Sequence, residues 1–167
     1  IKMKNLVYLA FIALLFSACA KDGEDGKDGA TGNANIQAFN FSTTPGSWIT
    51  NGTAGQNDHY KFVEFPVAAI TQAIMDDGMV LVYLNEAGYN VALPIVLPVS
   101  SSQYINLYTG VTIGKVEVDL QLNTLQTPNS SGINWDFKVV VASGLARISH
   151  PEINWKDYNQ VARTFNL

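Results

Sequence analysis

The sequence predicts an all-β domain built as an antiparallel β-sandwich, with a short amphipathic helix at its carboxyl end. Two observations support this prediction. After residue 35, short segments of alternating apolar and polar residues recur along the chain, and clusters of Gly, Pro, Asn and Ser separate them. Strands and helices do not alternate as in a parallel α/β fold. Two packed sheets of three to five strands are the simplest way to bury such segments, and an up-and-down barrel is the alternative.

The first and last expected strands carry aromatic side chains on one face. Phe39 and Phe41 share a face in the first, and Trp135 and Phe137 share a face in the last. Strands of this spacing fit an Ig-like or jelly-roll-like sandwich. The segments expected to form strands are residues 36–42, 59–67, 79–84, 89–99, 103–109, 115–122 and 134–142.

The segment 115–122 has the most regular alternation, which predicts a sheet with one face in water. The side chains expected to point inward are Val116, Val118, Leu120 and Leu122, and those expected to face water are Glu117, Asp119 and Gln121.

The middle of the chain departs from simple alternation. Residues 79–84 are continuously apolar, which predicts a strand buried on both faces, and the following residues 85–88 form a hairpin loop. Pro94 and Pro98 interrupt the next strand and indicate bulges or an irregular edge. Just before this region, residues 71–77 predict a helical turn capped by Thr71 and closed by Gly78.

The end of the chain changes to a helical period. Trp155, Tyr158, Ala162 and Phe165 recur every three to four residues, which predicts a short amphipathic helix docked on the sandwich. Asn154 is the expected N-cap, and Asp157 falls in the first turn, where the helix dipole favours an acidic residue. The sandwich domain is therefore expected to cover residues 35–167.

The beginning of the chain has the layout of a secretory signal. Lys2 and Lys4 precede an apolar run over residues 6–16, and small residues follow it. A membrane-spanning helix needs about 20 apolar residues, so this run is too short to remain as one. Residues 1–18 are therefore expected to be a cleaved lipoprotein signal peptide.

The only cysteine in the chain, Cys19, stands directly after this leader. The sequence Phe-Ser-Ala-Cys at residues 16–19 resembles the lipobox of bacterial lipoproteins. That resemblance implies a diacylglycerylated thiol, cleavage before Cys19 and an acylated amine. Two or more acyl chains hold a protein stably on a membrane, so the resemblance implies an exported protein anchored to the outer membrane. Whether the domain faces the periplasm or the cell exterior stays open.

Residues 19–34 carry a short glycine repeat. Gly23, Gly26, Gly29 and Gly32 are three residues apart, with acidic and basic residues between them. Collagen has the same period, but this tract has no proline to stiffen a triple helix. A solvated spacer is favoured over a trimerising stalk. The acidic residues of this tract resemble the export signals of surface lipoproteins in Bacteroidetes-type bacteria.

Taken together, the sequence resembles small lipoproteins of Bacteroidetes that carry a collagen-like tract. The resemblance implies a location and no particular activity. Besides the lipobox and the glycine triplets, the segments that carry it are residues 78–83, 93–98, 135–141 and 155–158.

Composition and motifs argue against several classes of function. Loss of Lys2 and Lys4 with the leader changes the formal net charge from −4 to −6. Without a basic patch, nucleic acid is not expected as a partner. The motifs of serine hydrolases, phosphate loops and zinc proteases are absent from the sequence, and with Cys19 acylated no thiol is left. Neither a metal nor another cofactor is expected.

The strongest candidate for a binding site is a strip on the strand at residues 103–109. Tyr104, Asn106 and Tyr108 share one face, while Ile105 and Leu107 take the other. If the aliphatic side faces the core, the two tyrosines can stack on sugar rings. Tyrosine is also an ordinary strand former, so a purely structural role stays open. The favoured function is a non-catalytic module that binds a glycan or a protein, or assembles with copies of itself.

The alternative function is a small hydrolase of the cell envelope that acts on carbohydrate or peptide. It requires two acid or base groups to converge in a concave pocket. Each candidate also has a simpler interpretation as a solvated turn or strand residue. The candidates are Asp76, Asp77, Glu117, Asp119, His59 and His150.

Overall fold

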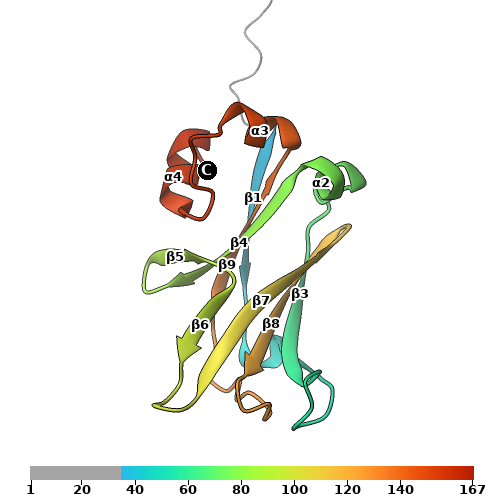
Figure 1. Cartoon of the computed structure of the whole chain (residues 1–167), viewed down its shortest axis with the longest axis vertical. Helices are drawn as coiled ribbons and strands as arrows, with labels where there is room; N and C mark the ends of the chain where they lie inside the picture. Colours follow the sequence, from blue (N-terminus) through green and yellow to red (C-terminus); the bar gives the residue numbers. More distant parts are fainter. Residues whose placement is uncertain (1–34) are drawn as a thin grey trace, which may run out of the picture. The chain divides into compact units, whose positions relative to one another are not determined.

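The computed structural model describes residues 35–167, and in this part of the chain two antiparallel sheets pack face to face (Figure 1). The predicted β-sandwich with a short C-terminal helix is confirmed. The signal peptide, Cys19 and the glycine tract lie outside the described residues. The four-stranded sheet has the order β1 (Ile36–Ser42), β9 (Asp136–Ala142), β4 (Met79–Glu86) and β5 (Tyr89–Ala92). The five-stranded sheet has the order β2 (Ile49–Asn51), β3 (Tyr60–Pro66), β8 (Lys115–Leu122), β7 (Tyr104–Thr112) and β6 (Ile95–Pro98).

The space between the sheets holds the first hydrophobic cluster. Every second residue of β3, β8 and β9 points into it, as the alternating pattern predicts. The rings of Phe41 and Phe65 stack across the two sheets with centroids 4.6 Å apart. Buried members of this cluster include Val63, Phe65, Val116, Val118, Leu120, Phe137 and Val139.

The second hydrophobic cluster lies on the outer side of the four-stranded sheet. It forms where α4 (Tyr158–Phe165) packs against β1, β4 and β9. Strand β4 is buried on both faces, as predicted: Val82 and Leu84 belong to the first cluster, and Tyr83 belongs to the second. Both clusters are built from residues 35–167, and these residues belong to one compact unit, so the domain contains its own core.

Tyr83 joins the C-terminal segment to the sheet. Its side chain is fully buried, and its hydroxyl donates a hydrogen bond to the carbonyl oxygen of Trp155 at 2.5 Å. Its ring meets the ring of Tyr158 edge to face, with centroids 5.1 Å apart. A buried tyrosine needs such a partner for its hydroxyl. This contact fixes where the C-terminal segment crosses the sheet.

One prediction about helix ends was wrong, and another is confirmed only in the position of the residue. The N-cap of α4 is Asp157, whose side chain accepts from the backbone N–H groups of Asn159 and Gln160 at 3.0 and 3.3 Å, and not Asn154. A backbone bridge between Asp157 and Val91 of β5 holds the preceding residues extended. Thr71 does precede α2 (Gln72–Asp77), but its side chain makes no capping hydrogen bond.

The expected strand at residues 89–99 is two strands. Pro94 lies between β5 and β6, and the chain passes there from the edge of one sheet to the edge of the other. Proline is tolerated at such a position because fewer backbone N–H groups of an edge strand donate to a neighbouring strand.

A second difference is the helix α3 (Gly144–Ser149), which the sequence did not predict. Ser143 caps this helix, because its side chain accepts a hydrogen bond from the N–H of Ala146 at 3.3 Å.

Gly78 ends α2 as expected, but for a different reason. Its φ is −84°, so no left-handed conformation requires glycine there. Instead, an added Cβ would lie 2.7 Å from the carbonyl oxygen of Ala142 and 2.8 Å from that of Ile74. Glycine is required because two backbone segments pass close to it.

We predict that Gly78→Ala destabilises the domain by about 1–3 kcal/mol, the usual cost of overpacking a tight site. Urea unfolding of the purified domain measures this change. Gly46→Ala is the control, because its Cβ would meet no heavy atom closer than 4.0 Å. Equal stability of the two variants would contradict the close approach at Gly78.

Candidate binding face

The two sheets differ in what covers their outer sides. The C-terminal segment packs on the four-stranded sheet (Figure 1). On the outer side of the five-stranded sheet, large apolar side chains stay exposed. Ile49, Val96 and Tyr104 are 55%, 58% and 42% exposed there. We call the middle of this surface the tyrosine face. Its members come from β3, β7 and β8: Tyr60, Phe62, Tyr104, Asn106, Tyr108, Glu117 and Asp119.

The three residues expected to form a binding strip lie together on this face. In the pairing of β7 with β8, Asn106 is opposite Gln121 and Tyr108 is opposite Asp119. On the other side of β7, Leu107 is buried in the core with 1% of its surface exposed. The placement of Tyr104, Asn106 and Tyr108 agrees with the expectation, and their role in binding stays a prediction.

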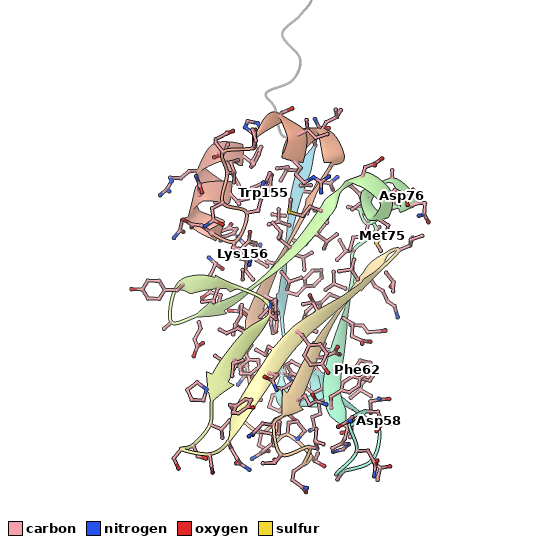
Figure 2. The ribbon with its side chains drawn as sticks, viewed as in Figure 1. Asp58, Phe62, Met75, Asp76, Trp155 and Lys156 are labelled. Carbon is pink, nitrogen blue, oxygen red and sulfur yellow. The ribbon has the colours of Figure 1, made fainter. Side chains whose placement is uncertain are left out.

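Sequence reasoning missed two aromatic members of the face, Tyr60 and Phe62. The ring centroid of Tyr60 lies 6.1 Å from that of Phe62 and 6.5 Å from that of Tyr108. Figure 2 shows Phe62 on β3, toward the end of the sandwich where Asp58 lies. The alternation of residues 60–64 put Tyr60 and Phe62 on one strand face. Only the strand order β3-β8-β7 shows that this is the face that carries Tyr108.

The prediction that Asp119 faces water is wrong. It sits between Phe62 and Tyr108 in the strand register, and only 6% of its surface is exposed. Aromatic side chains on both neighbouring strands shield it. Its Oδ1 atom is buried and accepts no hydrogen bond from the described residues. A buried carboxyl without donors is costly and is typical of functional positions.

Burial is the largest cause and the negative charge of Glu117 adds to it, and the pKa of Asp119 is thereby raised to about 7. Glu117 lies two residues away on the same side of β8, so its charge disfavours ionisation of Asp119.

The hydroxyls of Tyr60 and Tyr108 stay protonated. Burial raises the pKa of both Tyr60 and Tyr108, and the charge of Asp119 adds to the effect in each case. A protonated hydroxyl both donates and accepts. The face thus combines flat rings, hydroxyl groups, the Asn106 amide and a carboxyl acceptor.

The other residues considered for acid–base chemistry lie elsewhere. Asp76 and Asp77 belong to α2, and Figure 2 shows Asp76 far along the sandwich from Phe62. His59 is buried, with ring nitrogens 3.0 Å from the Asn51 carbonyl oxygen and 2.9 Å from Thr127 Oγ1. His150 contacts Glu152 at 3.2 Å. Of these candidates, Glu117 and Asp119 alone lie on the tyrosine face.

Metal binding finds no support in the part of the chain that is described. Within residues 35–167, His, Cys, Asp and Glu side chains do not gather in threes with the spacing that a metal ion needs. In the same residues, no helix combines the length and the apolar character required to cross a membrane.

Comparison with protein-family models, with curated proteins and with solved structures found no match in any of the three.

The raised pKa of Asp119 predicts a pH-dependent stability. Between pH about 4 and 7, Asp119 is protonated in the folded chain and ionised in the unfolded chain, so this group stabilises the fold at low pH and the stabilisation is lost as the pH rises through 7. Asp119→Asn should remove this loss, because the amide stays neutral. Thermal unfolding of both proteins between pH 4 and 8 measures it; parallel pH profiles would contradict the raised pKa.

Proposed function

We propose that this chain is a non-catalytic lipoprotein of the outer membrane whose tyrosine face binds a glycan. The observation that carries the proposal is the shielded Asp119 carboxyl, which lies between Phe62 and Tyr108 and has an acceptor atom without a donor. Binding sites typically pair an apolar lining with a few placed polar groups, and this face has that composition.

Sugars fit these groups chemically. A pyranose ring presents C–H groups on its faces and hydroxyl groups around its edge. The rings of Tyr60 and Tyr108 offer apolar surface, while Asn106 and Asp119 offer a donor and acceptors within the same strands. If the side chains that shield Asp119 move aside on binding, a sugar hydroxyl can donate to Oδ1 and satisfy the buried acceptor, which removes a cost of about 1–3 kcal/mol.

Binding is favoured over hydrolysis by the burial of Asp119. A glycosidase needs a separate acid and base on either side of the scissile bond, about 5–9.5 Å apart. Asp119 is instead buried within the sheet surface, with only 6% of it exposed. A hydrolase of carbohydrate or peptide remains the alternative, since the carboxyls of Glu117 and Asp119 do lie on one face.

The anchoring part of the proposal rests on the sequence. The leader over residues 6–16 and the cysteine that follows it support lipidation of Cys19. The glycine tract would then space the domain from the lipid.

We predict that Tyr108→Ala weakens glycan binding at least about tenfold, which corresponds to roughly 1.4 kcal/mol. Glycan-array screening of the chain from Ala20 onward identifies ligands, and calorimetry then compares the variants. Tyr104→Ala should weaken binding less, because Tyr104 lies at the end of the strip. Tyr89→Ala is the matched control, since Tyr89 is an exposed tyrosine of the other sheet. Unchanged binding by Tyr108→Ala, or sugar release from the ligand, would reject a binding role for this face.

Lipidation has a separate test. Cells that express the full chain with a clickable palmitate analogue should label the wild type, and Cys19→Ser should be unlabelled and lost from the membrane fraction. An unlabelled wild type that is secreted freely would refute the anchor without bearing on the tyrosine face.

A further inference from the structure

The end of the sandwich that carries α2 and α3 has an exposed apolar tip. Leu145 and Ile148 of α3 are 68% and 71% exposed, and Met75 of α2 is 42% exposed. The two short helices adjoin, because a Cβ on Gly144 would lie 2.8 Å from the carbonyl oxygen of Asp77. A hollow of about 330 Å³ between them has a mostly apolar lining that includes Ala73, Ile74, Leu145 and Ile148. We call Met75, Leu145, Arg147 and Ile148 the helical tip.

The chain enters the domain next to this tip. The backbone N–H of Ser143, the N-cap of α3, donates to the carbonyl oxygen of Asn35 at 2.8 Å. Ile36 then pairs with Ala142 at the start of β1. The segment that follows Cys19 in the sequence therefore joins the folded domain at α3, and Figure 1 shows β1 beginning beside this helix.

We infer that the helical tip rests on the lipid surface to which Cys19 is anchored. This inference rests on the anchor proposed above. A glycine-rich spacer of about 16 residues, as the sequence predicts for residues 19–34, would span roughly 20–24 Å, so a lipid attached to Cys19 would keep the end of the domain at Asn35 close to the membrane. The apolar side chains at that end meet the surface more often than any others on the domain.

The chemistry of the tip fits an interfacial contact. Leu145 and Ile148 lie three residues apart on α3, so they occupy the same side of the helix. Side chains of this kind enter the boundary between headgroups and acyl chains, and the adjacent cation of Arg147 can contact phosphate. Asp77 lines the same hollow and Asp76 precedes it on α2, and both oppose tight adhesion to anionic lipid. The tip therefore acts only when a tether supplies a high local concentration.

This orientation places the tyrosine face for binding. Contact through α3 directs the strands away from the membrane, because the helices gather at one end of the sandwich and the loop between β6 and β7 lies at the other (Figure 1). The strands then point away from the membrane surface, and the tyrosine face lies on the side of the domain, where a glycan can reach it.

The experiment uses single cysteines, because the chain from Ala20 onward contains none of its own. An N-terminal hexahistidine tag holds this chain on vesicles of phosphatidylethanolamine, phosphatidylglycerol and a nickel-chelating lipid. A polarity-sensitive fluorophore is attached to Ile148→Cys, with Ser101→Cys in the distant loop as the matched control. We expect a blue shift and strong quenching by nitroxide-labelled lipid for the label at residue 148 only. Adding Leu145→Asp should abolish both signals, and so should releasing the tag with imidazole.

Three outcomes would overturn the inference: an unquenched label at residue 148, equal quenching at residue 101, or a dimer in sedimentation that Leu145→Asp dissociates. Because nickel lipid replaces the natural anchor, the vesicle result does not depend on whether Cys19 is acylated. A quenched label together with an unlabelled Cys19 in cells would refute the anchor and leave the lipid affinity of the tip intact.

Discussion

The packing of the C-terminal segment on one side of the sandwich is the contact on which the rest of the structure depends. A sandwich has two inner faces, which bury each other, and two outer faces, which need separate solutions. Here Tyr83 and Tyr158 lock α4 onto the outer side of the four-stranded sheet, and β4 becomes buried on both faces. The outer side of the five-stranded sheet receives no such cover from α4. Its side chains can therefore contact a ligand.

The uncovered face departs from what stability alone would select. A strand with one side in water usually places its charges where water reaches them, as the alternation of β8 suggests. Asp119 instead lies almost fully shielded between two aromatic side chains, and this burial is the main cause of its pKa being raised to about 7. Such a group weakens the fold at neutral pH, and its retention is explained if a ligand supplies the missing donor.

Local patterns in the sequence predicted the sandwich, the doubly buried strand β4 and the shared face of Tyr104, Asn106 and Tyr108, because period-two alternation decides which side of a strand a residue occupies. They did not bring Tyr60 beside Tyr108, since strand order arises from contacts distant in sequence. Two further errors came from tertiary packing. Asp119 was expected in water because its covering rings belong to other strands, and Asn154 was expected as a cap because the bridge from Asp157 to β5 was invisible.

The central claim is that the tyrosine face, and not the helix-covered sheet, is the binding surface. Amide chemical shifts of the ¹⁵N-labelled chain from Ala20 onward test it most directly, during titration with soluble oligosaccharides of hexoses, pentoses and N-acetylhexosamines. The account predicts saturable shifts concentrated at Phe62, Tyr108 and Asp119, with β1 and α4 unaffected. Shifts centred on β1 or α4, or no shift with any of the oligosaccharides, would contradict it.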